Sequence, residues 1–116
     1  MSTVTSADGT EISFRTTGAG PTVVIVNGAL STAADAAPLA DALAEEGFRA
    51  VTWDRRARGA SGDRAGSTLE DEVADLAAVA AAVGGADAVL GHSSGAVLAL
   101  YAASRGVARR EALHRR

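Results

Sequence analysis

One short segment of this 116-residue chain is suited to covalent chemistry, the glycine-flanked stretch Gly91–Gly95, which reads Gly-His-Ser-Ser-Gly. Apolar runs at 86–90 and 96–100 surround it, so a strand is expected to turn into a helix at the serine. A serine in so sharp a turn has a strained backbone, and glycines two before and two after it let the strand and helix approach each other. The stretch therefore predicts a nucleophile elbow with Ser93 as nucleophile, and a glycine-flanked turn in another α/β protein is the alternative.

Two further segments extend this pattern. An apolar run at 22–26 ends in Asn-Gly-Ala-Leu-Ser, and residues 54–62 read Asp-Arg-Arg-Ala-Arg-Gly-Ala-Ser-Gly. With the elbow, they make the chain similar to the α/β-hydrolase superfamily, specifically its cofactor-independent serine hydrolases, from about Val4 to about Arg105. The resemblance matches only the N-terminal half of that family's domain. The chain departs from the family pattern at Asn27, where a histidine is usual, and at Ala57, where a glycine is usual.

The resemblance implies an oxyanion hole built from backbone N–H groups. Ser93 Oγ would attack an acyl carbonyl, and the N–H groups of Ser94 and Ala29 would hold the resulting oxyanion. Gly28 would let its loop pass close to the substrate, and the alternative for Gly28 is an ordinary turn glycine. Gly91 and Gly95 support the motif sterically. No metal and no cofactor are expected.

The family's chain order is Ser, then Asp or Glu, then His. Glu111 and His114 are the only acid and the only histidine after Ser93. A helix rises about 1.5 Å per residue, so Ser104 would lie roughly 15 Å from Ser93, and the tail would have to double back. We therefore expect Glu111 and His114 to form a solvated pair on a frayed end, and the family's acid and histidine to follow later strands that this chain lacks.

Two other polar residues adjoin the expected site. His92 precedes the nucleophile, but adjacent residues of a strand point to opposite faces, so packing or a supporting hydrogen bond is favoured over a role as base. Asp54 ends an expected strand and is a conceivable catalytic carboxylate. Its neighbours Arg55 and Arg56 favour an ion-paired structural role instead.

Hydrophobic patterning predicts the elements that would position these residues. Continuous apolar runs predict buried parallel strands at 22–27, 49–54 and 87–92. A turn signal at 7–10, followed by alternating residues at 11–15, predicts an antiparallel hairpin. The fold class is therefore α/β, with a mostly parallel, doubly wound sheet of the α/β-hydrolase type after an N-terminal antiparallel hairpin, truncated after the nucleophile-elbow helix.

Helices are expected between these strands. Pro38–Glu46 reads as a helix that Gly47 closes. Ser67–Glu70 matches a capping box, and apolar residues at helical spacing follow it as far as Val83. A third helix is expected from Ser94 to about Ser104.

This reading divides the chain into residues 1–105, the N-terminal half of a domain, and residues 106–116, a basic tail. With no strand after the elbow helix, Asp87–His92 would border an unpaired sheet edge through which the chain could self-associate.

Composition limits the expected partners, the possible cysteine chemistry and the expected location of the protein. The net charge is −3, so neither nucleic acid nor an anionic membrane is an expected partner. The chain has no cysteine, which excludes disulfides and thiolate chemistry. No stretch looks like a signal peptide or a membrane span, so a cytoplasmic protein is expected. The resemblance implies hydrolysis of an ester or related acyl bond in a small molecule, and a truncated, non-catalytic interaction module is the alternative.

Overall fold

Six strands form one mixed sheet in the order β1-β2-β4-β3-β5-β6. The structure is a computed structural model, and it describes residues 2–27, 33–56, 62, 68–92, 95, 98, 99, 102, 104 and 111–114, with 92 and 111–114 described by backbone alone. The strands are β1 (Ser2–Thr5), β2 (Glu11–Thr17), β3 (Thr22–Val26), β4 (Arg49–Trp53), β5 (Ala88–His92) and β6 (Glu111–His114).

The strand pairing confirms the predicted topology. β1 and β2 form the expected antiparallel hairpin, and β2 joins the sheet antiparallel to β4. β3 lies between β4 and β5 and is parallel to both. Their carboxyl ends therefore meet at one edge of the sheet, where open α/β sheets bind ligands.

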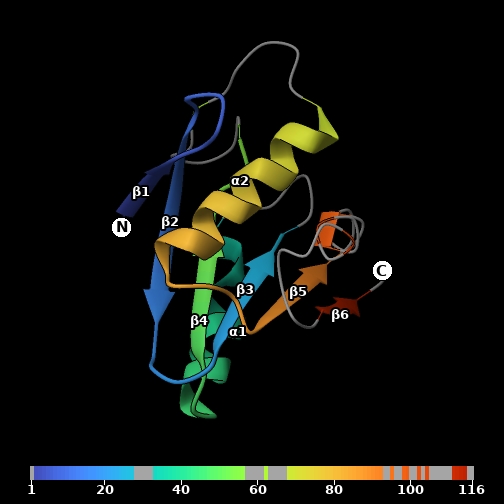
Figure 1. Ribbon diagram of the computed structural model, residues 1–116. Helices are drawn as coiled ribbons and strands as arrows, with labels where there is room; N and C mark the ends of the chain where they lie inside the picture. The colour runs from blue at the N-terminus through green and yellow to red at the C-terminus, as the bar shows by residue number, and fades with distance from the viewer. Residues whose placement is uncertain are drawn as a thin grey trace.

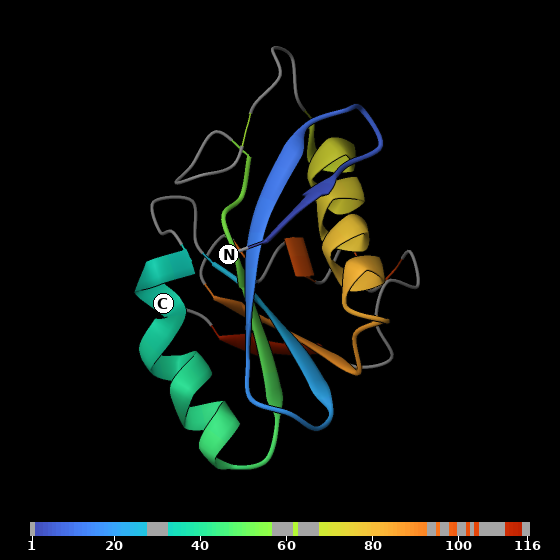
Figure 2. The same cartoon turned by 90° about the vertical axis from the view of Figure 1, so that its left-hand side faces the viewer.

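Helices cover both faces of the sheet. A 3₁₀ turn, η1 (Ala33–Ala36), leads into α1 (Ala37–Glu45) on one face, and α2 (Leu69–Ala82) lies on the other (Figures 1 and 2). Alternation along β3 explains the two layers, because Ile25 packs in the cluster of α1 and Val24 in the cluster of α2. The larger cluster, on the α2 face, also contains the buried residues of the helix after β5, which are Leu98, Ala99 and Ala102.

The glycine that ends α1 lies where the sequence predicted it, and the capping box of α2 lies one residue away from the predicted position. Gly47 ends α1 with a φ of +88°, a conformation that favours glycine. The capping box of α2 lies one residue later than predicted, since Thr68 is the N-cap and Asp71 its partner. Thr68 Oγ1 accepts a hydrogen bond from the Asp71 N–H at 3.3 Å, and Asp71 Oδ2 accepts one from the Thr68 N–H at 2.8 Å.

β6 contradicts the expected frayed tail and the expected end of the fold at the elbow helix. Glu111–His114 forms a strand parallel to β5, with Cα partners from Val89 and Glu111 to His92 and His114. The reach argument considered only the rise of the helix after β5. Because β6 is parallel to β5, the two strands end at the same edge of the sheet.

β5 is consequently not an edge strand, and within the described part of the chain the sheet ends at β6 on this side. Unpaired edge groups invite pairing with another chain. We therefore still expect the 116-residue chain to self-associate, with β6 as the pairing edge in place of β5. We also expect it to melt below about 60 °C. Analytical ultracentrifugation should show concentration-dependent association, and Ala112→Lys, which adds a charge to the edge strand, should reduce it. A monomer at all concentrations with a higher melting temperature would contradict this expectation.

Candidate active site

The carboxyl ends of β3, β4 and β5 bring Asn27, Asp54 and His92 to one edge of the sheet. This is the edge at which sequence reasoning placed the chemistry. Ser93 itself lies outside the described residues, as do the other three residues expected in or beside the oxyanion hole, Gly28, Ala29 and Ser94. The neighbouring residues that the structure describes are Asn27, Gly91, His92 and Gly95.

The two glycines of the elbow motif are both described. Gly91 is buried and pairs with Val26 in the ladder between β5 and β3. Gly95 is helical, and a Cβ added to it would lie 2.1 Å from Val26 O and 2.6 Å from Asn27 O. The chain just after Ser93 thus packs directly on the carboxyl end of β3. Only glycine fits there without a shift of the backbone, which is the steric reason that the motif requires.

Gly95→Ala should therefore destabilise the chain by about 1–3 kcal/mol, the usual cost of overpacking. The nearest atoms are backbone carbonyls, so no side chain can rotate away. Urea denaturation measures the loss. Gly62→Ala is the matched control, because its added Cβ would meet nothing closer than 3.6 Å. Equal midpoints for the two variants would show that the close approach at Gly95 does not constrain the fold.

Two consecutive residues after β4 contact the chain on both sides of Gly28–Thr32. Arg55 Nη1 donates to the Asn27 carbonyl at 3.1 Å, and Asp54 Oδ1 accepts from the Ala33 N–H at 2.6 Å. Both side chains are buried. Asp54 thus has a structural contact with the backbone, which agrees with the structural role that was favoured over a catalytic one. Sequence reasoning did not identify either contact, because the partners lie 21 and 28 residues away in the chain.

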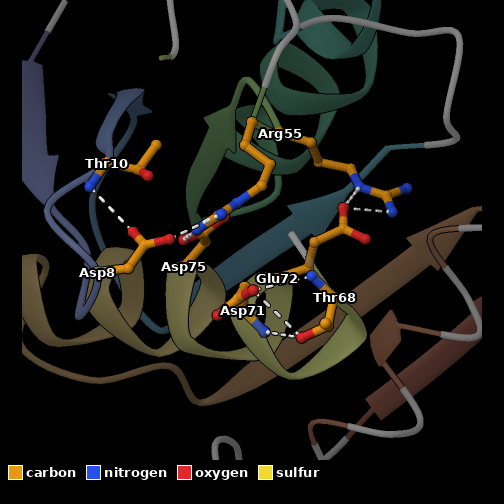
Figure 3. A network of polar contacts seen from close by, with 8 residues as sticks. Asp8, Thr10, Arg55, Thr68, Asp71, Glu72 and Asp75 are labelled. Carbon is orange, nitrogen blue, oxygen red and sulfur yellow. Dashed lines mark hydrogen bonds and ion pairs between the residues drawn. The ribbon is translucent and has the colours of Figure 1, made fainter. Parts of the chain in front are cut away.

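Arg55 and Arg56 also hold the α2 helix. Arg55 Nε and Nη2 donate to Glu72 Oε1 at 3.0 and 2.8 Å. Arg56 makes two hydrogen bonds of 2.7 Å to the carboxylate of Asp75, which is completely buried. Glu72 and Asp75 lie three residues apart on α2, and Figure 3 shows the guanidinium of Arg55 next to the carboxylate of Glu72.

Asp8 joins this network from the turn between β1 and β2. Its Oδ2 accepts from Arg56 Nη1 at 2.9 Å, and its Oδ1 accepts from the Thr10 N–H at 3.0 Å (Figure 3). The hydrogen bond from Arg56, followed by those from Thr10, holds the pKa of Asp8 well below its usual range. Hydrogen bonds to Asp75 and Asp8 raise the pKa of Arg56 in turn, so the guanidinium stays charged.

The depressed pKa of Asp8 makes this contact dependent on pH. A lowered folded pKa stabilises the fold above the ordinary value of 3.8, and the contribution is lost as pH falls through the folded pKa. Asp8→Asn should therefore lower the free energy of unfolding at about pH 7, and the difference from wild type should shrink below about pH 4. Urea titrations across this range test the prediction. A difference that stays constant from neutral to acid pH would contradict it.

β6 places His114 beside His92 but apart from Glu111. His114 and His92 are Cα partners, and neighbouring strands lie about 4.8 Å apart. The expectation that His114 is too far from the site is therefore wrong. Residues paired in register occupy the same face, so the alternation argument against His92 as base applies to His114 as well. Glu111 is three residues earlier, on the opposite face and about 10 Å away along the strand. The strand replaces the frayed end that was expected here, and the backbone positions of the two residues do not favour a triad.

Among the described residues, no group of three or more histidine, cysteine or acidic side chains could hold a metal ion. In the same part of the chain, no helix has the length and apolarity needed to cross a membrane.

A mixed sheet with helices on both faces, glycines at positions 91 and 95 and polar residues at the carboxyl ends of the strands are features of the α/β hydrolases. Residues 19–113 match the family described as "Serine aminopeptidase, S33". The chain belongs to this family of α/β hydrolases.

Individual proteins agree with this assignment. A "non-heme haloperoxidase" from Rhodococcus erythropolis is 35% identical over 112 residues, which cover 94% of this chain and 41% of that protein. The crystal structure of an α/β hydrolase from Sphaerobacter thermophilus DSM 20745 is 51% identical with a TM-score of 0.92, covering 97% of this chain and 44% of that one.

A thermophilic esterase from Thermogutta terrifontis is 28% identical with a TM-score of 0.84, over 97% of this chain and 44% of that one. Epoxide hydrolases also share the fold. The chain thus spans about two fifths of the length of these relatives.

Proposed function

We propose that this chain carries the nucleophile and the oxyanion hole of a serine hydrolase that cleaves an ester or a related acyl bond in a small molecule. Ser93 Oγ attacks the acyl carbonyl, and the N–H groups of Ser94 and Ala29 stabilise the oxyanion that forms. The reaction needs no cofactor and no metal. The packing of Gly95 on Val26 and Asn27 carries the proposal, because it is the close approach that a nucleophile elbow requires.

Family membership supports hydrolysis, and the similarity to an esterase supports an acyl substrate. Other similar proteins are a haloperoxidase and epoxide hydrolases, so the bond that is cleaved is part of the proposal. A serine hydroxyl is a poor nucleophile until a base takes its proton, and the described positions of His92 and His114 do not favour either as that base. Slow turnover by this chain is the expected consequence.

The test is hydrolysis of p-nitrophenyl acetate compared with an aminoacyl p-nitroanilide, the amide that an aminopeptidase would cleave. We expect slow release of nitrophenol, dependent on Ser93, and less release of nitroaniline. Faster cleavage of the anilide would contradict the ester proposal and indicate that the substrate is an amide. No hydrolysis of either above the Ser93→Ala background would favour the alternative, a non-catalytic interaction module.

A further inference from the structure

The segment that contains Ala29 is bounded by two described residues. Asn27 follows β3, and Ala33 begins η1. Arg55 binds the carbonyl of Asn27, and Asp54 binds the N–H of Ala33. Two adjacent side chains, which are 3% and 6% exposed, thus hold both ends of residues 28–32 against the end of β4.

The guanidinium of Arg55 is itself fixed in orientation. It donates twice to Glu72 on α2 and once to Asn27, and Glu72 is 20% exposed in this pair. The planar fork of arginine can make these contacts together, whereas a lysine ammonium cannot reproduce them. The position of the Asn27 carbonyl is therefore coupled to α2 through one rigid group.

The same carbonyl is the contact point of the elbow helix. A Cβ at Gly95 would lie 2.6 Å from Asn27 O, so the chain passes this oxygen one residue after Ser94. Ala29 lies two residues after Asn27. Each expected oxyanion donor is therefore one or two residues from this contact: Ser94 precedes Gly95, and Ala29 follows Asn27 by two residues.

We infer that Asp54 and Arg55 are positioning residues of the proposed oxyanion hole, because they fix Asn27 and Ala33 on either side of the segment that contains Ala29. This inference rests on the proposed function. Neither residue touches the reacting atoms. Their effect is to hold a backbone donor where negative charge develops, and misplacement of such a group by about 1 Å can cost about 10²-fold in rate.

The first measurement is hydrogen–deuterium exchange in peptides covering residues 28–36, which does not depend on activity. Arg55→Met and Asp54→Ala should speed exchange there by about 10-fold through local opening. Asp54→Asn, which keeps an acceptor oxygen, should restore most of the protection, and Arg55→Lys should restore little. Thr68→Ala is the matched control, since it removes the cap of α2 but no contact to Asn27 or Ala33. Unchanged exchange in both Arg55→Met and Asp54→Ala would overturn the inference.

The second measurement is the rate at which a fluorophosphonate modifies Ser93, compared among folded variants. Arg55→Met and Asp54→Ala should react about 10- to 100-fold more slowly, and Thr68→Ala within about twofold of wild type. Faster exchange with an unchanged reaction rate would reduce both residues to structural anchors and overturn the positioning role. A wild-type chain that does not react at Ser93 would refute the proposed function instead, and the exchange data would still decide whether Asp54 and Arg55 fix the segment.

Discussion

Asp75→Ala is expected to destabilise the chain by about 3–5 kcal/mol, because it leaves the buried Arg56 without its main partner. Asp75 is completely buried, and Arg56 is 3% exposed. Natural domains are stable by only about 5–15 kcal/mol, so this variant should lose a large fraction of its stability. Circular dichroism during urea denaturation measures the effect.

Two variants separate loss of the charge pair from other causes. Asp75→Leu combined with Arg56→Met replaces the pair by apolar groups and should recover much of the stability, since buried pairs cost desolvation. Asp41→Asn, on the exposed side of α1, should change stability by less than about 0.5 kcal/mol. A loss for Asp75→Ala as small as that for Asp41→Asn would show that the network does not stabilise the fold.

Ser93→Ala is expected to abolish the hydrolysis of p-nitrophenyl acetate that this chain supports. Acyl transfer that an oxyanion hole assists without a complete triad runs about 10³- to 10⁴-fold faster than in water, and the part of this activity that requires attack by Ser93 should disappear. His114→Ala should leave the rate unchanged, because His114 shares the sheet face of His92. Initial rates at several substrate concentrations measure both effects.

One result of the same assay would contradict the expectation for His114. Turnover above about 1 s⁻¹, within the usual enzyme range, that disappears in both His114→Ala and Glu111→Ala would mean that β6 completes a triad. The argument from the two faces of the strand would then be wrong.

The central part of the fold was predictable because its signals are local and strong. Thr22–Val26 is continuously apolar and is buried throughout, as a central parallel strand must be. The glycines of the elbow motif specified a close approach, and Gly95 shows it. The alternation of strands with helices predicted parallel neighbouring strands, and β3 is parallel to both β4 and β5.

Other features depend on contacts that a local pattern does not encode. The capping box was ambiguous by one residue, because Ser67 and Thr68 are each followed three residues later by an acid. β6 has only four residues beside an arginine-rich stretch, so its pattern was too short to be distinguished from a tail.

The partners of Arg55 and Arg56 were hidden for a related reason. Both arginines pair with acids on α2, 17 and 19 residues further along. The spacing of Glu72 and Asp75, three residues apart on one helix face, was the available signal.

The most direct test of the central claim is to locate the adduct that a fluorophosphonate forms with this chain. After reaction and proteolysis, mass spectrometry should find the phosphonyl group on Ser93 alone, and Ser93→Ala should remain unmodified. Equal modification of wild type and Ser93→Ala, or an adduct on another serine, would contradict the assignment of Ser93 as the nucleophile.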